Sequence, residues 1–286
     1  MNIIILIITV FCYAAQSILQ KVYSETQPDK GRRTSYLFNM LMTFSAILFF
    51  LFVSGGDLQF HVPTLIYGLG FGLCYGMAFL FNLLAVKNGP MSMTALVVSY
   101  SLIVPAFYGA IFLHEKVKPV VIIGIALLLL SLLFINKKSE KVIITKKWMV
   151  YALIAFLGNG GCSTVQKCHQ VAYPKMYQSE LMISALLPAF ILFCILFAVS
   201  KDKSGVKKLS KGLWIPLVAG LCNGVVNLFV MVLSAEIPAV LLFPVISGGG
   251  IVVTYFAARF LFKEYLSVQQ KIGFFLGTIS VIIMNL

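Results

Sequence analysis

The chain has 286 residues, of which 60% are hydrophobic and 11% are charged, whereas a soluble domain carries about 25% charged residues. So few ionised side chains cannot give a protein of this size a polar surface, which excludes a soluble globular fold and predicts a multi-pass membrane protein. The net charge of +13 comes from short basic clusters between apolar runs. It therefore lacks the continuous basic face of a nucleic-acid-binding protein, and we expect no nucleic-acid partner.

Ten apolar segments are long enough to cross the hydrocarbon core of a bilayer, which takes about 20 residues of helix. Their length and the lack of two-residue alternation argue against barrel strands. No basic residue precedes the first segment, so we expect a retained helix and not a cleaved signal peptide. In chain order the predicted helices are Asn2–Gln20, Ser35–Val53, Val62–Val86, Met93–His114, Pro119–Asn136, Trp148–Gln166, Ser179–Val199, Leu213–Ala235, Ala239–Phe262 and Ser267–Leu286.

The basic residues are distributed unevenly over the connections between these segments. Of the 22 Lys and Arg residues, 18 lie in or beside the odd-numbered connections and 4 in or beside the even-numbered ones. Cytoplasmic loops of membrane proteins carry the excess of Lys and Arg. We therefore expect the odd connections in the cytoplasm, both termini outside, and a location in the cell membrane, such as a bacterial inner membrane.

The two halves of the chain share polar and glycine residues in the same order, at offsets of 146 to 149 residues. The order predicts two repeats, residues 1–138 and 147–286. Because each repeat has five helices, an odd number, the second enters the membrane in the opposite orientation, as in many secondary transporters. The matched sets are Ser17, Gln20 and Lys21 with Ser163, Gln166 and Lys167; Gly72, Cys74 and Gly76 with Gly220, Cys222 and Gly224; Pro90 with Pro238; and Glu115, Gly124, Ser131 and Asn136 with Glu264, Gly273, Ser280 and Asn285.

These features resemble the drug/metabolite transporter superfamily, specifically its ten-helix EamA-like members. The resemblance covers nearly the full chain and rests on the order of weak motifs. It departs at Pro105, which has no proline partner at Val253, and family members are often drawn with cytoplasmic termini, opposite to the charge distribution. The motifs are Tyr13 to Lys21, Ala85 to Pro90, Pro105, His114-Glu115 and Gly124 in the first half, and Glu264, Gln269 and Gly273 in the second.

The resemblance implies a secondary transporter that moves a small organic metabolite through a central cavity. Helices 1, 3, 4, 6, 8 and 9 would line the cavity, with helices 5 and 10 at the periphery. The shortage of acidic residues within the spans favours a neutral or zwitterionic solute, amino-acid-like or nucleoside-like. The alternatives are a flippase for a lipid-linked carrier and a non-transporting membrane scaffold.

Polar and aromatic side chains inside the spans are the candidates for the substrate site. A buried amide without a partner is costly in lipid, so each either holds helices together or faces a water-filled cavity. The candidate substrate-binding residues are Tyr13, Gln16, Gln20, Asn82, Tyr100, Asn159, Gln166, Asn223, Asn227 and Gly249. Gly249 is included because Gly248-Gly249-Gly250 could form a hinge or an unwound segment, the alternative being close helix packing.

Three ionisable residues have two interpretations each. Glu180, the one acidic residue within a predicted span, is either a coupling carboxylate or an interfacial residue favoured by the helix dipole. Lys21 and Lys167, at predicted helix ends, either extend to the lipid headgroups or contact an anionic substrate group.

Enzymatic, metal and cofactor chemistry have no support in the sequence. The six cysteines form no CxxC pair and the three histidines are scattered, so no metal-ligand spacing occurs. No phosphate-binding Gly-Lys-Ser/Thr motif is present. We expect no enzyme activity, no metal and no cofactor, the lipid bilayer and a small solute as partners, and a monomer or homodimer.

Overall fold

The computed structural model describes residues 2–26, 32–59, 61–88, 94, 97–98, 101, 103–116, 118–135, 145–200, 212–260 and 268–284. These residues are almost entirely helical and contain no strand, so the predicted all-α membrane fold is confirmed. The helices are α1 (Asn2–Thr26), α2 (Arg32–Val53), α3 (Val62–Asn88), α5 (Ile103–Ile111), α6 (Pro119–Ile135), α7 (Lys146–Ala172), α8 (Gln178–Val199), α9 (Trp214–Ser234), α10 (Ala239–Phe260) and α11 (Val268–Met284).

The outer surface of the bundle is apolar, as a lipid-facing surface must be. Phe52, Leu73 and Phe260 are 85%, 70% and 74% exposed, which would be unfavourable in water but is suited to hydrocarbon. Within the described residues, α1, α2, α3, α7, α8 and α9 are long and apolar enough to cross a membrane. The number of crossings, ten, stays a prediction.

Most helices begin or end within a few residues of the predicted bounds, but two continue further. The first extends to Thr26 and the sixth, α7, to Ala172. Hydropathy marks where a chain leaves the hydrocarbon, whereas backbone hydrogen bonds carry a helix on into polar surroundings. Of the predicted helix Met93–His114, the structure describes α5 and a few residues before it.

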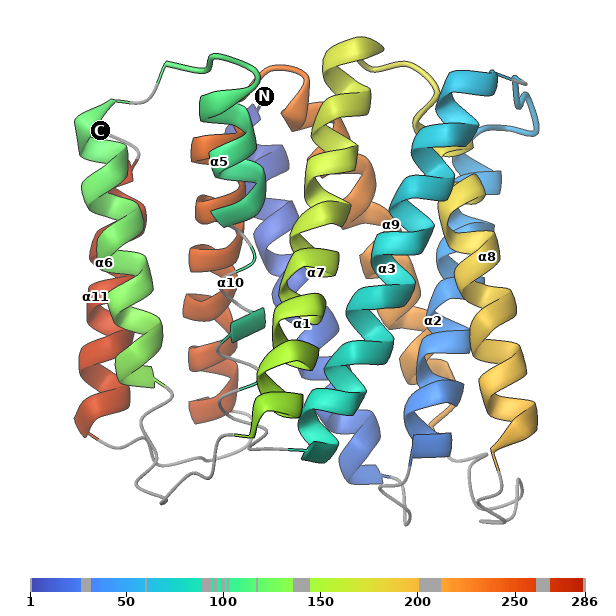
Figure 1. The fold of residues 1–286 in the computed structure, drawn as a ribbon, viewed down its shortest axis with the longest axis horizontal. Coiled ribbons are helices and arrows are strands. Elements are labelled where there is room, and N and C mark those ends of the chain that lie inside the picture. Colours follow the sequence, from blue (N-terminus) through green and yellow to red (C-terminus); the bar gives the residue numbers. More distant parts are fainter. Residues whose placement is uncertain are drawn as a thin grey trace.

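The helices run roughly along one axis, and the two halves of the chain interleave (Figure 1). Helix α1 begins and α11 ends at the same, upper end of the bundle, as an even number of passes requires. Helices α6 and α11 pack against each other at one edge. The side of the membrane that this upper end faces stays a prediction.

Contacts between helices occur in equivalent pairs when the two predicted repeats are exchanged. The repeat relates α1 to α7, α2 to α8, α3 to α9 and α5 to α10. Helix α3 packs on α7 and on α8, and correspondingly α9 packs on α1 and on α2. Likewise α10 packs on α1, and α5 packs on α7.

Matched glycines of the repeat lie at two of these equivalent contacts. A Cβ atom on Gly72 of α3 would lie 2.8 Å from the carbonyl oxygen of Ala185 in α8. A Cβ on Gly220 of α9 would likewise collide with the carbonyl oxygen of Met42 in α2. Small residues allow membrane helices to approach this closely, so both glycines bring a central helix against an outer one.

Within the described residues, the largest buried cluster lies where α2, α3, α7, α8 and α9 meet. Phe50, Leu181 and Leu186 are almost completely inaccessible there. Dispersion contacts of this kind hold membrane helices together, because burying apolar groups away from lipid gives little gain. The cluster fixes the positions of α3 and α7. Both helices also have polar residues that face the centre of the bundle.

Candidate functional site

A cavity of about 410 Å³ lies at the centre of the bundle. The helices expected to line it, α1, α3, α7, α9 and α10 together with the segment before α5, all contribute, while α6 and α11 contribute nothing. Helices α2 and α8 add one residue each. The lining residues are Tyr13, Gln16, Met42, Phe71, Tyr75, Val98, Ser101, Asn159, Cys162, Ser163, Gln166, Leu186, Asn223, Val226, Asn227, Val230, Phe243, Ile246 and Ser247.

Four amide side chains form a continuous hydrogen-bonded chain along the cavity, which we call the amide chain. Gln166 Nε2 of α7 donates to Asn227 Oδ1 at 2.8 Å. Asn227 Nδ2 donates to Asn223 Oδ1 at 3.0 Å, and Asn223 Nδ2 donates to Gln16 Oε1 of α1 at 2.9 Å. The amide chain therefore joins α7, α9 and α1, three helices from both halves of the sequence.

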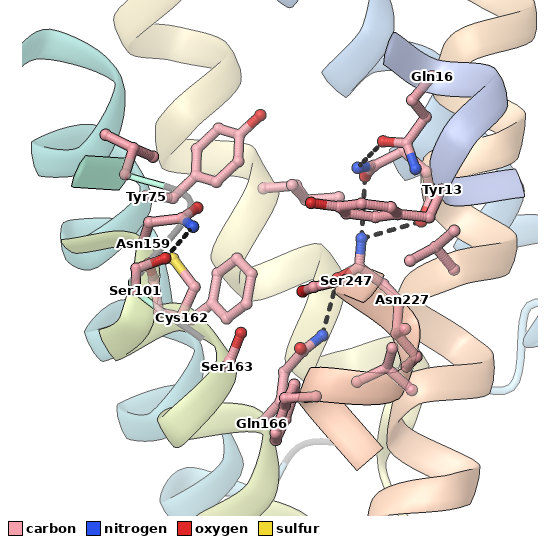
Figure 2. Close-up of a pocket in the computed structure, with 18 of the residues that line it drawn as sticks. Tyr13, Gln16, Tyr75, Ser101, Asn159, Cys162, Ser163, Gln166, Asn227 and Ser247 are labelled. Atoms are coloured by element: carbon pink, nitrogen blue, oxygen red, sulfur yellow. Dashed lines mark hydrogen bonds between the residues drawn. The ribbon is translucent and has the colours of Figure 1, made fainter. Parts of the chain in front are cut away.

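The amide chain retains hydrogen-bonding capacity toward the cavity. A primary amide has two N–H donors and an oxygen that accepts two bonds. The bonds above use one donor of Asn223, and Gln166 Oε1 has no partner among the described residues. Figure 2 shows the amides of Gln16, Asn227 and Gln166 around the cavity. A solute in the cavity can therefore both donate to and accept from this wall.

The opposite wall carries a second polar group. Asn159 Nδ2 of α7 donates to Ser101 Oγ at 2.6 Å, and Tyr75 of α3 lies beside this pair (Figure 2). The hydroxyl groups of Tyr75, Tyr13 and Ser247 make no hydrogen bond with the described part of the chain. Two polar walls thus face each other across the cavity.

Each wall contains a tyrosine and an asparagine that the predicted repeat relates to a pair on the other wall. The offset that aligns Ser17 with Ser163 also aligns Tyr13 with Asn159. The offset that aligns Gly72 with Gly220 also aligns Tyr75 with Asn223. Tyr13 and Asn223 lie on one wall and Asn159 and Tyr75 on the other, so the same two residue types recur in exchanged positions.

An ion pair lies beside the cavity, near the end of α7. Lys167 directly follows the lining residue Gln166, and its Nζ lies 2.9 Å from Glu115 Oε1. Lys167 is only 5% exposed and also donates to the carbonyl oxygens of Ser234 and Ile237, each at 2.9 Å. The pair joins the end of α5, α7 and the end of α9 at the upper end of the bundle.

The expectation that Lys167 extends to the lipid headgroups is wrong. The sequence placed Lys167 at a helix end, but α7 continues to Ala172 and keeps this lysine among its neighbouring helices. Its three ammonium donors are all taken by protein acceptors, so the structure gives it no free donor for an anionic substrate. The side chain of its repeat partner Lys21 lies outside the described residues.

The other predicted substrate residues are placed away from the cavity or are not described. Gln20 is exposed on α1 beyond the cavity, and Asn82 is half-buried on α3 without lining it. Tyr100 lies outside the described residues. Gly249 is close to Val10 of α1, since a Cβ there would lie 2.9 Å from Val10 Cγ1. Six of the ten candidates, Tyr13, Gln16, Asn159, Gln166, Asn223 and Asn227, line the cavity; binding by any of the ten stays a prediction.

The three consecutive glycines lie within an unbroken stretch of α10. The neighbouring Gly250 faces the ring of Tyr13, because a Cβ there would lie 2.5 Å from Cδ1 of that ring. The glycines thus let α10 approach α1 closely behind a cavity-lining tyrosine, which favours the packing interpretation over the hinge.

Glu180 lies at the beginning of α8 and away from the cavity. Its carboxylate accepts the backbone N–H of Gln59 at 3.0 Å, and it stands in the first turn of the helix. A carboxylate there interacts favourably with the positive end of the helix dipole. The position favours the interfacial interpretation, and the coupling role stays a prediction.

Sequence reasoning missed several cavity groups, namely the hydroxyls of Ser101, Ser163 and Ser247. Ser163 had a signal, because it belongs to the repeated Ser-x-x-Gln-Lys motif, and Ser247 immediately precedes the three glycines. Ser101 had none. Glu115 was also missed as a buried acid, although its match with Glu264 in the repeat pointed to it. Within the described residues no group of three His, Cys, Asp or Glu side chains could hold a metal ion.

A helical bundle with an apolar exterior and a polar central cavity defines the class of multi-pass membrane transporters. Residues 1–137 match the EamA-like transporter family. This part of the chain is therefore similar to that family, which confirms the predicted resemblance and supports a membrane transporter of the drug/metabolite type.

Solved structures share the fold. One, titled "Crystal structure of protein", superposes with a TM-score of 0.77 at 14% identity, over 99% of this chain and 95% of that chain. At that identity the likeness shows the fold alone. None of the curated proteins compared with the chain matches it in sequence.

Proposed function

We propose that this protein is a secondary transporter that moves a small organic solute, neutral or zwitterionic and amino-acid-like or nucleoside-like, by alternating access. The observation that carries the proposal is the central cavity with polar walls supplied by both halves of the chain. Its volume of about 410 Å³ falls within the range of about 300–1,000 Å³ usual for small-molecule sites.

The equivalent helix contacts support an inverted repeat of two five-helix units as the basis of the transport cycle. In such a repeat the two halves can exchange conformations around a site at the midplane. The cavity lies between α1 and α9 on one side and α3 and α7 on the other. Rocking of these units would expose it alternately to the two ends of the bundle.

The binding groups in this proposal are the amide chain, the Asn159–Ser101 pair and the two tyrosines. Amide groups that are left unpaired when the wrong solute binds reduce its affinity strongly. The apolar residues between the two polar walls, such as Phe71 and Phe243, would contact the apolar part of the solute.

Counterflow with the purified full-length protein tests the proposal. A thermal-stabilisation screen against amino acids, nucleosides and other small metabolites identifies a solute, and proteoliposomes loaded with it should then take up the labelled form. Asn227→Leu and Asn159→Leu, on opposite walls, should each reduce exchange about tenfold or more. Asn88→Leu, at the end of α3 outside the cavity, should leave it unchanged.

Other outcomes point to the alternative functions. Scrambling of a lipid-linked carrier without solute exchange would indicate a flippase. Neither activity in well-sealed vesicles would indicate a scaffold. Because Glu180 lies in the first turn of α8 and away from the cavity, we expect Glu180→Gln to leave exchange and its pH dependence unchanged; a lost pH dependence would assign the coupling to this carboxylate.

A further inference from the structure

The cavity walls carry no formal charge. Among the described residues that line it there is no Asp, Glu, Lys, Arg or His. Its polar groups are amides and hydroxyls, together with one thiol. A charged group that enters a cavity of low dielectric loses hydration, and a partner of opposite charge compensates that loss best.

Among the described residues, the ionised side chain that directly follows the lining residue Gln166 is already neutralised by the protein. Lys167 spends its three donors on Glu115 and two carbonyl oxygens. The second carboxylate oxygen of Glu115 accepts the backbone N–H of Ala239 at 2.7 Å and that of Val240 at 3.4 Å. This ion pair therefore offers no free charge to a solute in the cavity.

Helix ends are the other source of partial charge in transporter sites, and the one at the beginning of α10 is engaged by a side chain. The cavity is lined by inner turns of α1, α3, α7 and α9, whose backbone groups are used within the helices. The beginning of α10 is capped by Glu115.

Resting on the proposed transport function, we propose that the cavity selects solutes without formal charge and rejects both zwitterions and ions. The expected class is a compound with an uncharged donor-and-acceptor edge and an apolar or aromatic part, such as a nucleoside or a neutral amide. The donor-and-acceptor edge pairs with the amide chain or with Asn159, and the apolar part lies against the aromatic side chains.

The test compares compounds that share a scaffold and differ in charge. Binding to the purified full-length protein is measured for uridine and for four leucine derivatives: N-acetylleucinamide, which is neutral, leucine, which is zwitterionic, N-acetylleucine, which is anionic, and leucinol, which is cationic. Uridine should bind, and N-acetylleucinamide should bind about tenfold or more tightly than each charged derivative, because only the charged derivatives lose hydration without a partner.

A charge introduced into the amide chain should reverse the ranking. Asn223→Asp places a carboxylate in the cavity, so leucinol should gain at least about tenfold in affinity relative to N-acetylleucinamide. The matched control Asn88→Asp adds the same charge at the end of α3, outside the cavity, and should keep the ranking of the unaltered protein.

The outcomes separate this inference from the proposed function. Leucine or N-acetylleucine binding as tightly as the neutral derivative would overturn the selection of uncharged solutes, and so would the failure of every neutral compound to bind. Exchange of a zwitterion in proteoliposomes would leave the transport function intact while overturning this inference. No exchange of any solute would overturn both.

Discussion

Lys167 of α7 and Glu115 beyond the end of α5 form an ion pair at 2.9 Å, although 52 positions separate them in the chain. The carboxylate also caps the first N–H groups of α10, and the ammonium group caps carbonyl oxygens at the end of α9. The two opposite charges thus form a buried polar connection between the segment after α5, helix α7, the end of α9 and the beginning of α10.

Removing one member of this pair should destabilise the protein strongly. Lys167→Met leaves the Glu115 carboxylate buried without its counter-charge, at a cost of about 3–5 kcal/mol, which thermal unfolding in detergent measures. Lys175→Met is the control, because its pair with Glu236 is exposed and should contribute far less to stability than the buried pair. Equal losses for the two variants would contradict the role of Lys167.

Gly158 should be intolerant of even a methyl group. A Cβ there would lie 2.7 Å from the backbone nitrogen of Ala78 and 2.8 Å from the carbonyl oxygen of Cys74. Gly158→Ala therefore forces α7 away from α3, and we expect it to lower the unfolding free energy by about 1–3 kcal/mol.

The control for this substitution is Gly70→Ala on α3, the helix that Gly158 contacts. A Cβ at Gly70 meets nothing within 4 Å, so alanine should be neutral or stabilising by up to about 1 kcal/mol through its higher helix propensity. A Gly158→Ala variant as stable as Gly70→Ala would show that α3 and α7 are not in close contact.

The contact between Glu236 and Lys175 should weaken in acid. Glu236 lies in the connection between α9 and α10, and hydrogen bonds from Lys175 and then Asn2 lower the pKa of its carboxyl. A group with a lowered pKa in the folded state stabilises it above the ordinary value of about 4.3 and loses that contribution as the pH falls through the folded pKa.

Hydrogen exchange of the segment 235–238 checks this prediction. Exchange should accelerate below about pH 4, relative to the intrinsic rate at the same pH, in the unaltered protein. Glu236→Gln should show the faster exchange at both neutral and acidic pH. An acceleration that persists unchanged in Glu236→Gln would assign the pH effect to another group.

The distribution of basic residues predicts that both termini are outside the cytoplasm. A green fluorescent protein fused after Leu286 should be dark and an alkaline phosphatase fused there active, because each reporter matures on one side of the membrane. Fusions in the connection 136–145, which carries Lys137, Lys138 and Lys141, should give the opposite result. A fluorescent C-terminal fusion would reverse the orientation, as drawn for many EamA-like transporters.

Much of the architecture could be predicted from the sequence, because membrane insertion depends on local composition. The segments starting at Val62, Pro119 and Ala239 begin helices at the predicted residue, since a stretch of apolar residues can satisfy its backbone in lipid only as a helix. The ends of α1 and α7 were predicted too early, because a helix can continue where its hydropathy falls. The helices that line the cavity were also anticipated from the resemblance.

The partners of polar side chains could not be predicted from the sequence. Gln16 and Asn223 are 207 positions apart, yet their amides form a hydrogen bond. His61 and His169 are scattered in sequence, but both bond to the hydroxyl of buried Thr64. Such contacts depend on which faces of two helices meet, and no local pattern specifies that.

The amino-acid sequence by itself determined that this chain is a helical membrane protein with a strong excess of basic residues in alternate connections, because hydrophobicity and length act on each segment separately. Tertiary structure alone decided that six of the ten candidate residues line one cavity, while Gln20 and Asn82 lie elsewhere. It also decided that Lys167 is neutralised by Glu115 and not free at the surface, because helix packing buries the two charges against each other.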